Sequence, residues 1–174
     1  VSNPALLGVD PKEFSDRKAF SFVRTADKIS ADDAWAALDK TSQDAIPVIA
    51  DQSTIMWSLG KSVGDTLDYT DGNGNPFKVR LIASLDNSIF QGRILLSSKY
   101  LEMLYPSIGG TRDLLVDAPA GSVKELQKQL LEKFEDLGLD AMPASERLAE
   151  FNKVENTYLD IFLMLGALGF AIGT

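Results

Sequence analysis

The run of apolar residues near the C-terminus constrains this chain more than any other feature. Residues 161–172 read IFLMLGALGFAI, without a charged or polar side chain. A surface helix of a soluble protein is apolar along one stripe only, whereas a helix with this sequence is apolar on every side. At 1.5 Å per residue the run is about 18 Å long, and a bilayer core needs about 20 residues. Either protein or lipid must cover such a helix.

The residues before this run favour lipid. Residues 146–160 form an amphipathic pattern that continues into the run, as in a helix that leaves a domain and enters a membrane. This flank carries the acidic residues Glu146, Glu150, Glu155 and Asp160 against the basic residues Arg147 and Lys153. A cytoplasmic flank favours Lys and Arg, so the bias indicates the outer side of the membrane. We therefore expect residues 145–174 to form a helix leading into a transmembrane span that is cut off partway. The alternative is a helix buried in the core of its own domain.

Three glycines in or beside the apolar run have helical spacing. Gly169 and Gly173 form a G-x-x-x-G pair, and Gly166 lies one turn earlier. Small residues at this spacing let membrane helices approach closely. We therefore take these three glycines as candidate positions for membrane-helix packing.

Composition argues against several classes of function. The 17 basic residues face 25 acidic ones, for a net charge of −8, whereas nucleic-acid binding needs clustered Lys and Arg. The chain has no His and no Cys, so it lacks the commonest general base, thiol nucleophiles and the usual zinc ligands. We expect no nucleic-acid partner, no catalytic residue, no metal and no cofactor, and we do not expect an enzyme.

Two short motifs resemble ligand loops but depart from them at essential positions. Gly60-Lys61-Ser62 matches the end of a phosphate-binding loop, but Ile55 stands where the loop's first glycine belongs. Residues 71–75 begin like a calcium loop, but Pro76 replaces the required glycine and Ile82 replaces the bidentate Glu. We interpret residues 71–75 as the turn of a β-hairpin.

The segment 85–93 joins two predicted strands and places Ile89 and Phe90 among polar residues. Phe90 is a candidate contact for a partner protein, because exposed aromatic residues often anchor interfaces. The alternative, which we favour, is that Ile89 and Phe90 close the core of a small barrel.

Hydrophobic period, turn residues and caps predict the secondary structure, and the expected N-caps of the helices are Ser30, Asp51, Ser97, Ser122 and Ser145. Strands are expected at 46–50, 66–69, 77–85, 93–96, 114–116 and 139–142, and helices at 30–40, 51–59, 97–104, 122–137 and from 145 onward. The strand–helix–strand order within 112–144 predicts a β-α-β unit.

Several of these segments resemble one family. The residues Asn156 to Thr174 resemble the start of the second transmembrane helix of FtsX/MacB-type ABC transporter permeases. The run Ile46–Ala50, then Gly64–Leu67, then Phe77–Val79, is similar to the periplasmic domain that precedes that helix, as is the segment Asn87–Leu96. The first 45 residues carry no such likeness.

This resemblance implies an α+β fold, a two-lobed periplasmic permease domain with a long C-terminal helix entering the membrane. On this basis residues 1–45 are a partly irregular N-terminal segment with one helix, and 46–111 form a small β-rich lobe. Residues 112–144 form a β-α-β porter-like lobe, and 145–174 form the helix leading into the membrane.

The resemblance also implies a function without catalysis. Such a domain couples ATP-driven motion of membrane helices to substrate export or to a periplasmic partner. The implied partners are a cytoplasmic ATPase subunit, a second permease subunit in a dimer, the membrane and a periplasmic partner or substrate. The implied location is the inner (plasma) membrane, with this domain on its periplasmic side. The alternative is a free soluble binding module whose apolar C-terminal helix belongs to its core.

Overall fold

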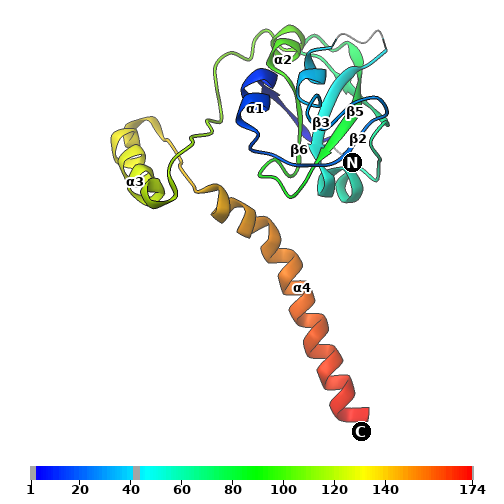
Figure 1. Cartoon of the computed structure of the whole chain (residues 1–174), viewed down its shortest axis with the longest axis vertical. Coiled ribbons are helices and arrows are strands. Elements are labelled where there is room, and N and C mark those ends of the chain that lie inside the picture. Colours follow the sequence, from blue (N-terminus) through cyan, green and yellow to red (C-terminus); the bar gives the residue numbers. More distant parts are fainter. Residues whose placement is uncertain (1–2, 41–43, 174) are drawn as a thin grey trace. The chain divides into compact units, whose positions relative to one another are not determined.

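The computed structural model describes residues 3–40 and 44–173, and within them all side chains except those of 154–157, 159, 160, 169 and 171–173. The chain divides into two compact units, residues 1–112 and 113–174. Figure 1 shows a mixed sheet with short helices in unit 1, and only helices and connecting segments in unit 2. The α+β class expected from the sequence is confirmed.

Unit 1 is built on a six-stranded mixed sheet. Its strands are β1 (Ala5–Val9), β2 (Phe22–Thr25), β3 (Ile46–Asp51), β4 (Thr66–Thr70), β5 (Pro76–Leu85) and β6 (Arg93–Ser97). The strands β3 to β6 lie where the sequence predicts strands. By contrast, β1 and β2 lie in a segment that we expected to be irregular.

The strand order is β1-β6-β3-β5-β2, and β4 also pairs with β5. The pairs β1–β6 and β3–β5 are parallel, whereas β3–β6, β4–β5 and β2–β5 are antiparallel. A shift in the β3–β5 register leaves Ile82 between the pairs Val48–Leu81 and Ile49–Ala83. Because of this extra residue, the consecutive side chains Ile82 and Ala83 both contribute to the core on one side of the sheet, where a regular strand would alternate.

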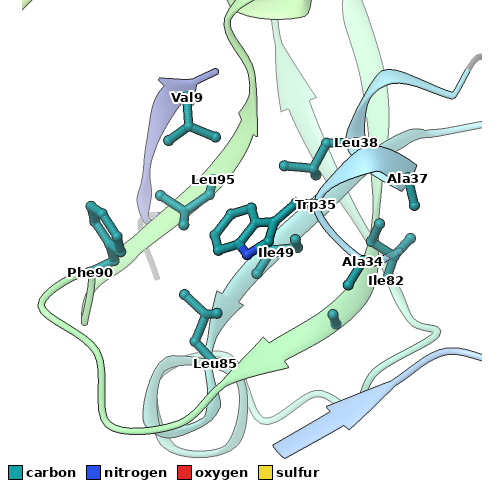
Figure 2. Close-up of a cluster of buried hydrophobic side chains, with 11 residues drawn as sticks. Val9, Ala34, Trp35, Ala37, Leu38, Ile49, Ile82, Leu85, Phe90 and Leu95 are labelled. Atoms are coloured by element: carbon teal, nitrogen blue, oxygen red, sulfur yellow. The ribbon is translucent and has the colours of Figure 1, made fainter. Parts of the chain in front are cut away.

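Both faces of the sheet are buried. Cluster A, on one side, consists of Val9, Ala34, Trp35, Ala37, Leu38, Ile49, Ile82, Ala83, Leu85, Phe90 and Leu95 (Figure 2). Cluster B, on the other, consists of Val48, Ala50, Ile55, Leu67, Val79, Leu81, Ile94, Leu96 and Leu104. Alternate residues of β3 and β6 enter different clusters, as expected where successive side chains point to opposite faces. The apolar runs in these strands therefore reflect burial on both sides.

Short helices cover the two clusters. The helix α1 (Pro11–Arg17) begins after Asp10, whose carboxylate accepts hydrogen bonds from the amides of Lys12 (2.9 Å) and Glu13 (3.2 Å). Its Phe14 packs on Trp35 of cluster A, with ring centroids 4.9 Å apart. On cluster B lies α2 (Ser98–Leu104). It packs so closely on β1 that a Cβ at Gly8 would meet Leu101 Cδ2 at 2.9 Å.

Side-chain bonds bring β4 to the chain just before β1. Tyr69 Oη donates to Pro4 O (2.8 Å), and Asn3 Nδ2 donates to Asp68 O (2.6 Å). Burial, followed by the nearby Tyr105, raises the pKa of Tyr69 to about 12, which keeps its hydroxyl protonated as a donor. The sheet therefore curls so that β4, at one side, reaches the start of β1, at the other.

The helices expected at residues 30–40 and 51–59 of unit 1 are not α-helices. The first is replaced by turns and a 3₁₀ helix, and the second by a π-helical turn. Residues 31–35 form turns that lead into the 3₁₀ helix η1 (Ala36–Asp39). Ser30 nevertheless acts as expected of a cap, since its hydroxyl accepts the amide of Asp33 at 3.2 Å. The second is η2 (Thr54–Ser58), a single π-helical turn.

Unit 2 contains η3 (Ala120–Ser122), α3 (Val123–Lys133), η4 (Glu135–Leu137) and α4 (Ala144–Gly173). The strands expected at 114–116 and 139–142 are absent, because both segments lack any regular structure. That prediction was wrong, and with it the β-α-β pattern within 112–144. Strand propensity alone does not make a strand, since a strand also needs a partner for its backbone.

Two predicted helix caps in unit 2 were also wrong. The hydroxyl of Ser122 donates to Pro119 O (2.9 Å) and caps no amide of α3. The helix α4 begins one residue before Ser145, and the amides of Glu146 and Arg147 both donate to Pro143 O.

Candidate functional site

The apolar part of α4 is exposed to solvent wherever its side chains are described. The large side chains Ile161, Phe162, Leu163, Met164, Leu165, Leu168 and Phe170 are between 47% and 76% exposed. These residues lie on all sides of a helix that turns 100° per residue. The described side chains of this run therefore form an exposed apolar surface on α4.

The start of α4 is polar and is stabilised by contacts between neighbouring side chains of the helix. Arg147 Nη1 lies 3.1 Å from Glu150 Oε2, and the Arg147 guanidinium lies over the Phe151 ring, 4.8 Å from its centroid. Exposed ion pairs of this kind contribute little, about 0.3–0.5 kcal/mol within a helix. At 30 residues, α4 is about 45 Å long and continuous from its polar start to its apolar end.

The three candidate packing glycines all lie within α4. Their spacing of three and four residues places them on one helix face. A Cβ added at Gly166 would have no atom within 4 Å. The surroundings of Gly169 and Gly173 lie outside the described side chains, so packing at these positions stays a prediction.

Among the residues that the structure describes, no helix is both long and apolar enough to cross a membrane.

Phe90, the candidate partner contact, is buried in cluster A with 6% of its surface exposed. Its ring centroid lies 5.2 Å from that of Phe20 and 6.0 Å from that of Phe14. Figure 2 shows the ring near Leu95. Of the two alternatives for Phe90, the structure agrees with the core and not with an exposed anchor.

A buried carboxylate explains why the loop before β6 turns Phe90 inward. Asp51, at the end of β3, is 1% exposed. Its Oδ2 accepts the amide (2.6 Å) and the hydroxyl (2.7 Å) of Ser88, and its Oδ1 accepts both groups of Ser53. The Thr54 hydroxyl accepts the amide of Gly92 at 2.8 Å. The loop is thus fixed on both sides of Phe90. A carboxylate with four donors is satisfied as a structural group.

The calcium-like segment 71–75 uses its carboxylate within its own turn. Asp71 Oδ1 accepts the amides of Asn73 and Asn75, each at 2.8 Å, and Oδ2 accepts Asn75 Nδ2 at 3.1 Å. These bonds, led by that from the Asn75 side chain, lower the pKa of Asp71. The segment is the hairpin turn that the sequence predicts, between β4 and β5.

Across the described residues, no group of three or more acidic, His or Cys side chains is arranged to hold a metal ion. Within the same part of the chain, every buried side-chain nitrogen and oxygen has a hydrogen-bond partner. The polar interior of unit 1 is therefore explained by its own hydrogen bonds.

Two exposed apolar features were missed by the sequence analysis. On the π-helical turn η2, Trp57 is 79% exposed and Met56 is 47% exposed. In unit 2, Leu114, Leu115 and Val116 are 74%, 49% and 60% exposed. The π-helical turn η2 was missed because no sequence pattern distinguishes it from an α-helix. The exposure of residues 114–116 was missed because their sequence predicts a buried strand.

Comparisons with known proteins supply no family for this chain: no family model matches it, and neither do any curated protein or solved structure.

Proposed function

We propose that this chain is the extracytoplasmic domain of an FtsX/MacB-type ABC transporter permease, and that the apolar end of α4 enters the membrane. The proposal rests above all on one observation: the described large side chains from Ile161 to Phe170 lie exposed on every side of a continuous helix. An exposed apolar surface of this size on a helix favours contact with lipid.

In this proposal α4 transmits motion. A continuous helix is a stiff connection, so displacement of its membrane end displaces its polar start as well. A cytoplasmic ATPase subunit would drive that motion, and a second permease subunit would complete the membrane part. Residues 46–111 and 112–144 would be the two lobes on the periplasmic side, acting without catalysis of their own. The transported substrate or periplasmic partner would respond to the movement of these lobes.

Membrane binding by α4 is tested with vesicles of phosphatidylcholine in a flotation assay. We expect the intact chain to float with the vesicles, because each large apolar side chain that leaves water contributes about 1.5–3 kcal/mol. Phe162→Asp should weaken binding at least tenfold, since a charge within the bilayer costs about 2.5–3.5 kcal/mol. A matched control is Leu137→Asp, because Leu137 is 80% exposed but lies outside α4. This control should bind like the intact chain.

Equal flotation of Phe162→Asp and the intact chain would contradict membrane insertion by α4. The permease assignment has its own test, which is purification of the protein from detergent-solubilised membranes. An ABC-type ATPase should co-purify with it. Flotation without such an ATPase would leave a membrane-bound domain of another class.

A further inference from the structure

The tip of the β4–β5 hairpin carries the pair Asn73-Gly74, the one Asn-Gly sequence in the chain. Both residues are exposed. Glycine has no side chain, so its backbone nitrogen is less shielded than that of any other residue that can follow an Asn. This nitrogen can attack the side-chain amide of the preceding Asn, a reaction that contributes to the thermal lability of Asn. The hairpin tip therefore presents a reactive pair on the surface of unit 1.

The folded turn does little to restrain this pair. The backbone amide of Gly74 donates to Asp71 O at 3.1 Å, across an exposed turn where water can replace the carbonyl. A Cβ added at Gly74 would have no atom within 4 Å, so nothing packs against this residue there. Attack by the Gly74 nitrogen therefore requires the opening of one exposed hydrogen bond.

Asn87, in the loop before β6, is the contrasting case. It is exposed as well, but the amide nitrogen that follows it belongs to the buried Ser88. That amide donates to Asp51 Oδ2 at 2.6 Å, and the Ser88 hydroxyl donates to the same oxygen at 2.7 Å. Attack by the Ser88 nitrogen would break the first of these bonds and leave a buried carboxylate short of a donor. Two exposed asparagines thus differ in the state of the amide that follows each.

The neighbouring residues of the tip lack a comparable route. Asn75 is followed by Pro76, whose nitrogen carries no proton that the reaction can release. Asp71 is followed by Gly72, but the Gly72 amide donates to Leu104 O at 2.9 Å. The Asp71 carboxylate is itself held by three hydrogen bonds within the turn. The reaction within the hairpin is therefore confined to one asparagine.

We propose that Asn73 is a site of spontaneous deamidation through the backbone nitrogen of Gly74. This nitrogen attacks Asn73 Cγ, so that a new N–Cγ bond closes a succinimide ring while the Cγ–Nδ2 bond breaks. The Gly74 amide proton leaves with Nδ2 as ammonia. Water then adds to either ring carbonyl and opens the ring, which gives aspartate or β-linked isoaspartate in place of Asn73. No atom is oxidised or reduced in either step.

Both products change the turn in which they form. Each adds a negative charge near Asp71, in a chain whose net charge is already −8. The isoaspartate also adds one atom to the backbone between Asp71 and Asn75. Because Asp71 Oδ1 accepts the amides of Asn73 and Asn75, each at 2.8 Å, a longer turn displaces these donors. We expect the deamidated chain to melt at a lower temperature than the intact chain. The site is independent of the membrane binding proposed for α4, since it shares no residue with that helix.

The test is incubation of the intact chain in mildly alkaline buffer, with peptide mapping by mass spectrometry at intervals. Electron-transfer fragmentation separates isoaspartate from aspartate. The same incubation in urea gives the rate of each asparagine in the unfolded chain. Folding should slow conversion of Asn73 less than about tenfold, because one exposed bond opens easily, and that of Asn87 at least about a hundredfold, because its loop is held by a buried carboxylate.

Two variants test the chemistry at the tip. Asn73→Gln keeps a side-chain amide but adds one methylene, so attack by Gly74 would close a larger ring that forms less readily. Conversion in this peptide should fall at least about tenfold, with the melting temperature unchanged. Asn73→Asp supplies the charge of one product without incubation, so its melting temperature measures the effect of that charge alone.

Two results would overturn the proposal. The first is a rate for Asn73 that folding slows about a hundredfold or more, as expected for Asn87, because the turn would then protect it. The second is conversion that continues at the full rate in the Asn73→Gln peptide, because the ammonia would then come from another residue.

Discussion

Asp39, at the end of η1, joins the segment before β3 to the start of α2. Its Oδ1 accepts the hydroxyl of Ser97 (2.6 Å), and its Oδ2 accepts the Lys99 ammonium (2.7 Å). Ser97 is fully buried, whereas the Lys99 side chain is 76% exposed. The hydrogen bond from Lys99, followed by that from Ser97, lowers the pKa of Asp39. Ser97 thus serves as a partner for Asp39 rather than as the side-chain cap of α2 that its position in the sequence indicates.

Asp39→Ala should lower the free energy of unfolding by about 1–3 kcal/mol at neutral pH, because the buried Ser97 hydroxyl loses its acceptor. The measurement is urea unfolding followed by circular dichroism. Asp68→Ala is the matched control. Asp68 also pairs with a lysine (Lys78, 3.6 Å), but that carboxylate is 82% exposed, so its loss should cost at most about 0.5 kcal/mol. Equal losses for the two variants would contradict the role of the buried hydroxyl.

The contribution of Asp39 to the free energy of unfolding should also depend on pH. Its pKa is lower in the folded protein than its ordinary value of 3.8. Its charge therefore stabilises the fold fully above pH 3.8, and this contribution is lost as the pH falls through the folded value. The difference between the intact chain and Asp39→Asn should shrink over that acidic range. A stability difference that grows as the pH falls would contradict the predicted direction of this pH dependence.

At the scale of elements, the β4–β5 hairpin is tied to the end of α2. The amide of Gly72 donates to Leu104 O (2.9 Å), and Tyr105 Oη donates to Thr70 O (2.6 Å). Residues 72–75 are exposed, as the sequence predicts for a hairpin tip. The bond from Gly72 uses a residue within the turn 71–75, whereas the bond from Tyr105 to Thr70 does not.

Replacing residues 71–75 with a two-residue Asn-Gly turn should therefore leave unit 1 folded. It should lower the melting temperature by about 3–6 °C, the equivalent of one hydrogen bond worth about 1 kcal/mol. Gly72→Ala is the control, since it keeps the amide and its Cβ would lie an ordinary 3.4 Å from Leu104 O. Thermal unfolding by circular dichroism gives both values. Loss of the folded state in the shortened hairpin would show that the turn is required for folding.

At the scale of the whole molecule, the end of α4 is separable from the folded core. Deleting residues 161–174 should leave the unfolding free energy of unit 1 within about 0.5 kcal/mol, because exposed residues contribute little. It should also raise solubility, because an exposed apolar surface promotes self-association. If these residues instead belonged to a core, each loss of a Leu or Phe would cost about 2–5 kcal/mol.

Circular dichroism and sedimentation of the shortened chain distinguish these two cases. A shortened chain that is unfolded would contradict the proposed membrane role and favour a soluble module with a buried C-terminal helix. Leu81→Ala gives a reference value for the stability lost when a core side chain is truncated, since Leu81 is fully buried in cluster B. It should lower stability by about 2–5 kcal/mol.

Local sequence patterns were enough for those parts of the fold that depend on near neighbours. The strands β3 to β6 follow from short apolar runs between turn residues, and the β4–β5 turn follows from residues that tolerate positive φ, such as Gly74 at +88°. The long C-terminal helix follows from its apolar run. In each case the information lies within about ten residues, so no knowledge of distant partners was needed.

Other features depended on contacts between residues far apart in the chain. The strand β1 pairs with β6, nearly 90 residues later, and β2 pairs with β5. Neither segment has a strong strand pattern in its own sequence, and each becomes a strand through its distant partner. Phe90 is buried because Asp51, 37 residues before Ser88, holds the loop that carries it. Residues 114–116 have the composition of a strand but lack a partner, and they stay exposed. Sequence alone determined where the chain prefers to be extended, helical or apolar. Tertiary structure decided which extended segments became strands and which apolar side chains became core, because both require a surface that another part of the molecule provides.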